Sequence, residues 1–379
     1  MSEWKKCPIG EVVTLRQGFA INAKSKHYMS KEETSLPLLR IADMKNGTKE
    51  VFVKEEIPQR FIAHPEDIIY TRTGNVGLVF RNNYGVMHNN CFSVTPNDAD
   101  ELSRDFLYYA LQNKTFFDTA NALARGAAQP DLPHTSFNSI EFAYPSLFVQ
   151  ERIAYILSRY DSLIENYQKQ IKLLEEAAQR LYKEWFIDLH FPEHENTNII
   201  DGVPEGWEKK KVGEVIAKVP RSKQIPTKDY QNEGAIPIID QSRDYIAGYT
   251  DDIESRVESN EPYIVFGDHT RILKYVPFPF AKGADGTQLI MSNNLDLMPQ
   301  CLLFTSLVSV DLSNYSYARH FKYLKEEEIL VPTASIANAF SKHVAKWYAK
   351  IQLNREQLRF LTEARDRLLP KLMSGEIEI

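Results

Sequence analysis

The chain has 379 residues, of which 43% are hydrophobic, 25% are charged and 11% are aromatic. This composition is typical of a globular protein of two or three domains, and it excludes disordered, collagen-like and disulfide-scaffold classes. Forty-five basic and 51 acidic residues give a net charge of -6, which argues against a protein that coats nucleic acid regardless of sequence.

The cysteines Cys7, Cys91 and Cys301 are far apart and form no CxxC motif, so the sequence predicts neither a disulfide framework nor a zinc knuckle. No run of residues is apolar for long enough to span a membrane, and the first residues lack the apolar core of a signal peptide. We therefore expect a cytoplasmic protein that does not bind membranes.

The first globular domain is predicted over residues 1–149 and mixes strands with helix. Strand-like runs, separated by turns rich in Gly and Asn, occur at Leu36–Ile41, Asp67–Thr71, Val76–Phe80 and Cys91–Val94. An amphipathic helix is predicted after them by the apolar positions Leu102, Phe106, Tyr109, Ala110 and Phe117. This mixture indicates an α+β domain.

A long central helix is predicted over residues 150–187. Its apolar or small residues alternate at spacings of four and three, which is the signature of a coiled-coil seam. The seam positions are Ile153, Leu157, Tyr160, Ile164, Tyr167, Ile171, Leu174, Ala178, Leu181 and Trp185. At about 1.5 Å per residue, such a helix extends roughly 50 Å, which is long enough to hold two modules apart.

Residues 188–206 are expected to form a linker. Within it, His190 to His194 has the HxxEH order of some zinc peptidases. That chemistry needs both histidines on one face of a helix, and Pro192 would break or kink such a helix. A metallopeptidase is therefore the third and weakest interpretation of the chain, and an absence of stoichiometric zinc would exclude it.

A second globular domain is predicted over residues 207–334, and it begins like the first. Trp207, Gly213, Glu214 and Val215 match Trp4, Gly10, Glu11 and Val12 at a constant offset of 203. Strands are predicted around Ile236–Ile239, Tyr263–Phe266 and Gln288–Met291, with a shorter helix near Pro299–Leu307.

The start of this second domain is locally basic. Seven cations share a stretch with a single acid, Glu214, and they are Lys209, Lys210, Lys211, Lys218, Arg221, Lys223 and Lys228. The stretch could meet phosphates, although a solvated surface is the commoner explanation for a run of lysines.

A C-terminal helix and tail are predicted over residues 335–379. Shifted by 187, the first seam becomes Phe340, Val344, Trp347, Ile351, Asn354, Leu358, Leu361, Arg365, Leu368 and Leu372. A polar seam residue such as Asn354 or Arg365 lowers stability but fixes the register of two helices. The alternative is that the helices splay apart there.

These repeats predict the architecture. We expect an α+β fold in which two similar globular domains are separated by two long antiparallel coiled-coil helices, with a pseudo-two-fold repeat.

Motifs for catalysis are missing from the sequence. It contains no GxxxxGK[ST] phosphate loop, no glycine fingerprint for a nucleotide cofactor, and no Asn or Asp followed by Pro-Pro-aromatic, the tetrapeptide of adenine methylases. No convincing spacing of nucleophile, base and orienting residue was found either. We therefore expect no catalytic residue, no metal and no cofactor in this chain.

The order and duplication of several motifs resemble the specificity subunit of type I restriction-modification enzymes over essentially the whole chain. The motifs are the helix ends 181–188 and 368–377, the segments Thr73–Gly77 and Phe266–Arg271, and the domain starts at Trp4 and Trp207. The resemblance implies that each globular domain reads one half of a bipartite target in double-stranded DNA. It also implies that the helices set the unread spacer and dock two adenine methyltransferase subunits.

The same resemblance implies a division of labour among subunits. The methyltransferase partners would bind S-adenosylmethionine and flip out the target adenine. Restriction subunits, which translocate and cleave DNA, would use ATP and magnesium. This chain would be a non-catalytic subunit of that multisubunit methyltransferase and endonuclease.

Sequence readout needs Arg, Lys, Asn, Gln or small hydroxyl side chains at base edges, with further contacts to phosphates. In the first domain the candidates are Arg72, Thr73, Asn75, Arg81, Asn82, Asn83, Arg125 and Gln129. In the second domain they are Gln241, Ser242, Arg243, Asp268, His269, Thr270, Arg271, Lys282, Arg319 and His320. Several could instead serve the fold, since Asp268 could equally cap a turn.

The aromatic end of the first long helix, Tyr182, Trp185 and Phe186, is the candidate docking surface for the methyltransferase, because such side chains are enriched at interfaces. Packing of the helix onto its own domains would explain these rings almost as well. The main alternative function is a standalone DNA-binding regulator or scaffold with tandem domains and no methyltransferase partner.

Overall fold

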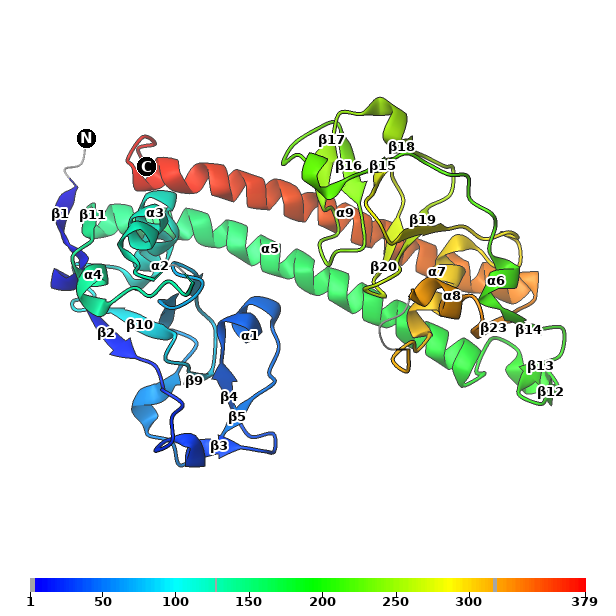
Figure 1. The fold of residues 1–379 in the computed structure, drawn as a ribbon, viewed down its shortest axis with the longest axis horizontal. Helices are drawn as coiled ribbons and strands as arrows, with labels where there is room; N and C mark the ends of the chain where they lie inside the picture. Colours follow the sequence, from blue (N-terminus) through cyan, green and yellow to red (C-terminus); the bar gives the residue numbers. More distant parts are fainter. Residues whose placement is uncertain (1–3, 127, 316–318) are drawn as a thin grey trace. The chain divides into compact units, whose positions relative to one another are not determined.

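The computed structural model describes residues 4–126, 128–315 and 319–379. They form two compact units (Figure 1). Unit 1 consists of Met1–Ile164 and Phe360–Ile379, and unit 2 of Glu165–Arg359. Each unit thus combines one globular part with a portion of each of the two long helices.

The globular part of unit 1 contains two sheets. An antiparallel sheet has the order β2-β10-β7-β8, with β2 (Val13–Gln17), β10 (Cys91–Pro96), β7 (Ile68–Thr71) and β8 (Val79–Phe80). A mixed sheet has the order β3-β5-β4-β9-β6, with β3 (Met29–Ser30), β5 (Phe52–Val53), β4 (Leu36–Leu39), β9 (Gly85–Met87) and β6 (Ile62–Ala63). All four residues of β7 are buried, as expected for a strand covered on both faces.

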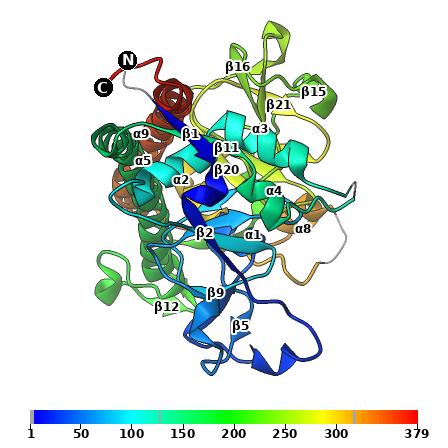
Figure 2. The ribbon, with the colours of Figure 1, turned by 90° about the vertical axis from the view of Figure 1, so that its left-hand side faces the viewer.

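Helices and a two-stranded ribbon complete unit 1. The helices are α1 (Ile41–Asn46), α2 (Arg104–Gln112), α3 (Lys114–Leu123) and α4 (His134–Asn138), and the short 3-10 turns are η1 (Ile9–Glu11), η2 (Lys26–Tyr28) and η3 (Gln59–Phe61). Strand β1 (Lys5–Pro8) pairs antiparallel with β11 (Glu141–Tyr144), as Figure 2 shows. This ribbon joins the start of the chain to the segment that leads into the first long helix.

Three predicted elements of this domain differ in the structure. The predicted helix from Leu102 to Phe117 is two helices, because Asn113 has extended backbone angles (φ -59°, ψ 135°) and ends α2 before α3 begins. The strand predicted over Val76–Phe80 is reduced to β8, because Gly77 adopts a positive φ of 96° in a turn. The strand predicted to reach Ile41 ends at Leu39, and Ile41 begins α1.

The globular part of unit 2 also combines one antiparallel and one mixed sheet, with a different number and order of strands. One antiparallel sheet has the order β20-β19-β22, with β20 (Leu273–Val276), β19 (Tyr263–Gly267) and β22 (Thr287–Ile290). A mixed sheet has the order β15-β21-β16-β17, with β15 (Gln224–Ile225), β21 (Phe280–Gly283), β16 (Ile236–Ile239) and β17 (Gly248–Thr250), and β18 (Arg256–Val257) also pairs with β21. The central parallel pair β16–β21 corresponds to β4–β9 in unit 1.

Unit 2 also repeats the ribbon. Strand β14 (Glu208–Lys211) pairs antiparallel with β23 (Glu328–Val331), at positions shifted by 203 and 187 from β1 and β11. The helices are α6 (Val212–Val215), α7 (Gln300–Ser309) and α8 (His320–Leu324), and the 3-10 turns are η5 (His194–Asn196), η6 (Thr227–Asp229) and η7 (Ile253–Ser255). The expected internal repeat is therefore confirmed in the topology.

A glycine that follows the first strand of each ribbon, in η1 or in α6, explains one part of the repeated sequence. A Cβ atom on Gly10 would lie 2.6 Å from Cβ of Asn138, and one on Gly213 would lie 3.1 Å from the carbonyl oxygen of Lys325. Both glycines therefore let the backbone pass close to the end of a short helix, α4 or α8.

The long helices are α5 (Leu147–Tyr182) and α9 (Ala334–Met373), and a π-helical turn η4 (Lys183–Ile187) continues α5. Both begin slightly before the expected starts at 150 and 335. They run antiparallel, since in unit 1 Asp161 of α5 faces Arg365 of α9, and in unit 2 Gln170 faces Asn354. No helix in the described part of the chain has the length and apolar character that crossing a membrane requires.

Both polar positions of the second seam have polar partners on the first helix. Nδ2 of the fully buried Asn354 donates to Oε1 of Gln170 at 3.1 Å, and Nη1 of Arg365 donates to Oδ1 of Asp161 at 3.0 Å. The helices are therefore joined at these points and do not splay apart. A shift of one helix along the other would bury these groups without partners, so the pairs favour one register.

The expected linker 188–206 is folded. It contains the strands β12 (Ile199–Ile200) and β13 (Val203–Pro204), which pair antiparallel. Phe191 is buried against Trp207, with ring centroids 4.7 Å apart. Residues 188–206 were predicted to be a linker because of their polar composition. Apolar contact with the second domain gives this segment a defined structure.

Replacement of Asn354 tests the register device. Among the described residues, its buried Oδ1 has no hydrogen-bond partner. Asn354→Leu is therefore expected to raise the free energy of unfolding by about 1 kcal/mol, because it removes an unsatisfied carbonyl and extends the apolar seam. Asn354→Asp should lower it by about 2 kcal/mol, because it buries a charge. Urea unfolding followed by circular dichroism measures both, and a Leu variant less stable than the parent would contradict the assignment.

Candidate nucleic-acid interface

Two of the candidate segments of unit 1 lie together. The loop after β7 pairs with the segment after α3, because the amide of Gly74 donates to the carbonyl of Pro130 at 2.8 Å. Arg125 and Asp131 exchange both backbone hydrogen bonds, each 2.8 Å long. Gly126, which follows Arg125, has a positive φ of 100°. The fold thus brings Arg72, Thr73 and Asn75 to Arg125 and Gln129.

Asp131, which the sequence analysis did not select, holds this loop pair together. Its carboxylate accepts hydrogen bonds from Nη2 of Arg72 at 2.7 Å and from Oγ1 of Thr73 at 2.6 Å. Burial alone would raise the pKa of the Asp131 carboxyl, but these hydrogen bonds and the charge of Arg72 lower it below its usual range. Arg72 also donates to Oε1 of Gln17 at 3.2 Å, so it serves mainly to position the loop.

The side chains left for a ligand are on the outer side of this loop pair. Asn75, Arg125 and Gln129 are exposed, whereas Arg72 and Thr73 are half-buried. An arginine, a glutamine and an asparagine are the side chains that read guanine and adenine edges most specifically.

The third candidate segment of this domain, Arg81 to Asn83, has a different place. The Arg81 guanidinium stacks on the ring of Tyr108 at 4.1 Å and pairs with Asp161 of α5 at 3.2 Å. Asn82 has a positive φ of 58°, and Nδ2 of Asn83 donates to the carbonyl of Arg81 at 2.8 Å. These residues form a turn and tie it to the long helix.

In unit 2, Gln241 connects the candidate loops. Its Nε2 donates to the carbonyl of Asp285 at 2.8 Å, and its Oε1 accepts from the amide of His269 at 3.1 Å. Oγ1 of Thr270 donates to the Gln241 carbonyl at 2.7 Å. A Cβ on Gly286 would lie within 3 Å of both His269 and Gln241, so a side chain there would push these loops apart.

The buried side chains of Asp268 and His320 stabilise the same loops from the interior of the domain. The buried Asp268 carboxylate accepts from the amide of Phe321 at 2.8 Å, so it caps the start of α8, the alternative role considered for it from the sequence. The buried His320 ring lies 2.9 Å from the carbonyl oxygens of Asp268 and Tyr315. Neither side chain is exposed to a ligand.

The remaining candidates of unit 2 lie around this core of hydrogen bonds. Arg243, His269, Thr270, Arg271 and Arg319 are exposed. Nη1 of Arg271 donates to the carbonyl of Leu312 at 3.0 Å. Ser242 is half-buried, and its amide donates to Asp240 at 2.8 Å.

Lys282 lines a polar cleft that contains part of the basic stretch. The cleft, of about 520 Å³, is bounded by Val219, Pro220, Arg221, Ser222, Gln224, Lys282, Gln288 and Leu289. It therefore has two cationic side chains and no carboxylate among its lining residues. Burial lowers the pKa of Lys282 from its ordinary value.

Carboxylates neutralise much of the rest of the basic stretch. Lys209 pairs with Glu328, Lys211 with Glu326 and Lys223 with Asp252, each at 2.7 Å. Lys210 pairs with Glu208. Arg221, which lines the cleft, forms no ion pair with a described residue, so it is the cation of this stretch best placed for an anion.

The loops of the two units occupy equivalent places although their sequences differ. In unit 1 the loop follows β7 and lies beside the segment that leads into α4, which begins at His134. In unit 2 it follows β19 and lies beside the start of α8, which begins at His320. Comparison of the two halves of the sequence could not show that α4 and α8 are equivalent. Their equivalence is recognised only from the strands that each helix lies beside.

The three rings predicted to dock a methyltransferase are inside unit 2. Tyr182, Trp185 and Phe186 are 5%, 9% and 4% exposed. They pack against Phe340, and Phe186 also packs against Trp207 at 5.3 Å between ring centroids. The rings fill the junction between helix and domain, which is the alternative role considered for them, and their part in docking a methyltransferase stays a prediction.

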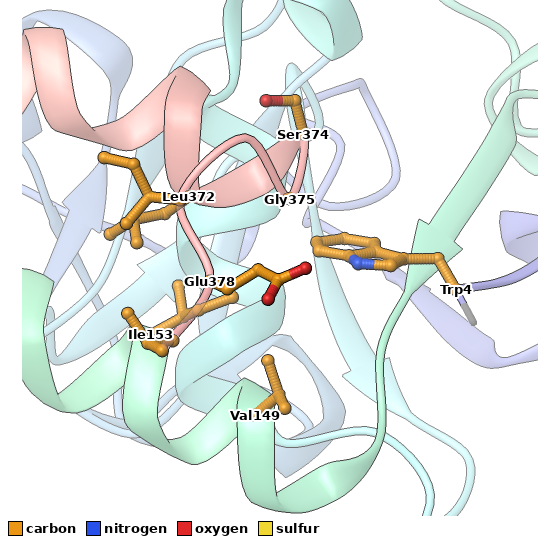
Figure 3. Close-up of a pocket in the computed structure, with 9 residues that line it drawn as sticks. Trp4, Val149, Ile153, Leu372, Ser374, Gly375 and Glu378 are labelled. Atoms are coloured by element: carbon orange, nitrogen blue, oxygen red, sulfur yellow. The ribbon is translucent and has the colours of Figure 1, made fainter. Parts of the chain in front are cut away.

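The same junction in unit 1 has smaller side chains and retains a cleft of about 270 Å³ (Figure 3). Trp4 corresponds to Trp207, but Ile153 and Leu372 stand where unit 2 has Phe340 and Trp185. Trp4, Val149, Ile153, Leu372 and the tail residues Gly375 and Glu378 surround the cleft.

The possible zinc motif does not form a helix across both histidines. The turn η5 begins only at His194, and Glu193 before it has a positive φ of 67°. Among the described residues, no group of three or more His, Cys, Asp or Glu side chains is placed to hold a metal ion.

Three kinds of comparison agree on the family. Residues 1–176 match the family model of the type I restriction modification DNA specificity domain. The MjaIX type I restriction enzyme specificity subunit of Methanocaldococcus jannaschii is 29% identical over 314 residues, which cover 76% of this chain and 72% of that protein. The HindI specificity subunit of Haemophilus influenzae is 21% identical over 485 residues and matches across 100% of both chains.

A solved structure shows the same fold. The crystal structure of the type I restriction-modification S subunit from M. genitalium superposes with a TM-score of 0.65, covering 98% of this chain and 96% of that one at 18% identity. The chain is thus similar in sequence and in fold to the DNA specificity subunits of type I restriction-modification systems.

Proposed function

We propose that each unit reads one half of a bipartite DNA target and that the two long helices set the length of the unread spacer. The observation that carries this proposal is the pair of equivalent loop clusters, one at the end of β7 and one at the end of β19. The equivalent positions of the two loop clusters support the same role for both. Their different side chains support two different half-sites.

The contacts divide between bases and phosphates. In unit 1, the exposed Asn75, Arg125 and Gln129 read base edges, while Arg72 and Asp131 hold them in place. In unit 2, the exposed readers are Arg243, His269, Thr270, Arg271 and Arg319. Arg221 and Lys282 in the polar cleft contact a phosphate, because they offer positive charge without an adjacent carboxylate.

Catalysis belongs to partner subunits in this proposal. Two methyltransferase subunits dock on the chain, bind S-adenosylmethionine and methylate adenine. Restriction subunits translocate and cleave the DNA with ATP and magnesium, and the assembly works in the cytoplasm. The chain itself contributes sequence selection, which agrees with the absence of nucleotide-binding and methylase motifs from its sequence.

Mapping of methylated adenines tests the proposal directly. The chain is expressed with the methyltransferase encoded beside it, and a defined DNA is then sequenced by a single-molecule method that detects methylated bases. We expect a two-part motif with an unread gap. A contiguous motif would contradict two separate readers, and a stable complex with an active partner but no methylation would favour the standalone regulator.

The polar cleft gives a prediction about salt dependence. Arg221→Ala and Lys282→Ala should each weaken binding to all sequences about equally and reduce the slope of log affinity against log salt by about one. Fluorescence anisotropy of the assembled complex at several salt concentrations measures this slope. Lys223→Ala is the matched control, because Asp252 already neutralises Lys223. An equal change in the control would rule out the cleft as the phosphate contact.

The spacer role requires a matched change in both helices. Deletion of residues 163–169 from α5 and 356–362 from α9 removes one heptad from each and keeps Gln170 opposite Asn354. At about 1.5 Å per residue, the preferred spacer should shorten by about three base pairs, with both half-sites retained. Methylation mapping of the variant measures the spacer, and an unchanged spacer in a folded complex would refute the role.

Deletion from α5 alone is the control for this experiment. It shortens the segment between Asp161 and Gln170 on α5 but not the segment between their partners on α9. Asp161 and Gln170 can then no longer face Arg365 and Asn354 at the same time. This variant should lose stability, because one polar pair or the other would be left unpaired inside the seam.

A further inference from the structure

One carboxylate in unit 1 joins three separate parts of the chain. Asp161 lies on α5, and its side chain is 13% exposed. Its Oδ2 accepts from the Tyr109 hydroxyl at 2.7 Å and from Nη2 of Arg81 at 3.2 Å. Its Oδ1 accepts from Nη1 of Arg365 at 3.0 Å. We call these four residues the Asp161 cluster.

The members of the Asp161 cluster come from both long helices and from the globular part. Tyr109 belongs to α2, Arg81 to the turn after β8, and Arg365 to α9. Arg81 is itself held by the rings of Tyr108 and Tyr109, at 4.1 and 5.4 Å from its guanidinium carbon. A single charged group therefore connects the reading domain to the two helices at once.

Other contacts between these parts are the apolar core and the neutral hydrogen bonds of Gln150 at the start of α5, which accepts from the amide of Ser103 and donates to the carbonyl of Glu101. The core of unit 1 brings Phe106 of α2 together with Ile153 and Leu157 of α5 and with Leu372 of α9. Apolar burial stabilises such packing but is not directional, whereas charge-assisted hydrogen bonds have defined lengths and angles. The Asp161 cluster is thus a charged and directional part of this interface that includes both long helices, and it can specify an angle between the domain and the helix pair.

Unit 2 does not repeat this arrangement at the matching positions, although its Arg355 of α9 pairs with Glu175 of α5 and stacks on Tyr245. Shifted by 187, Asp161 corresponds to Tyr348 and Arg365 corresponds to Ala178. The Tyr348 hydroxyl lies 3.0 Å from Oγ1 of Thr305, and its ring packs against Tyr275. Since the matching position is filled by aromatic packing, the repeat of the fold does not by itself require a carboxylate at position 161.

We infer that Asp161 is a positioning residue for spacer recognition, which holds the reading domain of unit 1 at one angle to the helix pair and so restricts the spacer lengths that the protein accepts. This inference rests on the proposed bipartite function. Arg81, first considered as a DNA-contacting residue, acts in this cluster and has no direct role in reading bases.

The test compares spacer tolerance with half-site recognition. The full chain, with its methyltransferase partner, is given DNA in which the two half-sites are constant and the spacer varies by one or two base pairs. Asp161→Asn keeps the size of the side chain but removes the carboxylate that joins Arg81 to Arg365, and leaves these two arginines only the exposed carboxylates of Asp105 and Asp366. Methylation at the altered spacers, relative to the preferred one, should rise by about fivefold or more, with both half-sites unchanged.

Two further variants separate positioning from general stability. Tyr109→Phe removes one hydrogen bond of the Asp161 cluster and should relax spacer choice less than Asp161→Asn. Glu176→Gln is the matched control on the same helix, because Glu176 pairs only with Lys172 and Arg180 among the described residues. It should leave the spacer profile unchanged.

Each outcome has a defined meaning. A folded Asp161→Asn complex with the parental spacer profile would overturn the inference and leave the bipartite function intact. If Asp161→Asn does not fold, Tyr109→Phe decides, and a parental profile in that variant would overturn it. Relaxed half-sites with a constant spacer would also overturn it. A parent protein that shows no two-part motif would instead refute the proposed function.

Discussion

The register of α5 against α9 is the constraint on which the rest of the structure depends. An apolar heptad seam packs almost equally well after a shift of one heptad, so apolar packing alone would leave the alignment open. The pairs Asn354–Gln170 and Arg365–Asp161 remove this freedom, because any shift would bury at least one of these polar groups without a partner. Each globular part packs on both helices, so the helix residues that it contacts depend on the register.

Polar side chains in the loops of the two globular parts serve two separate purposes. Asp131, Arg72 and Gln241 hold loops together through hydrogen bonds, while Arg125 and Gln129 face solvent from the same loops. A rigid inner layer of this kind reduces the ordering that binding requires, because the loops are already in place. The same residue types therefore appear in both layers, and composition cannot distinguish them.

The two units show how a duplicated fold can carry unlike sites. The ribbons β1–β11 and β14–β23 and the starts of both long helices occur at matching positions. The helix-to-domain junctions are filled differently, with large rings around Phe340 in unit 2 and with smaller side chains around Ile153 in unit 1. Strand pairing and the glycines near α4 and α8 maintain the common topology. Side chains at other positions can therefore differ between the two units.

Local periodicity in the sequence determined the heptad helices, the buried strands such as β7 and β16, and the repeat that relates the two halves, because each depends on residues close together in the chain. The folding of residues 188–206 was decided by tertiary contacts. So were the burial of Tyr182, Trp185 and Phe186 and the use of Arg81 beside Asp161. A polar or aromatic residue looks the same in sequence whether it faces solvent or a distant partner, and only the packing of separate segments decides between the two.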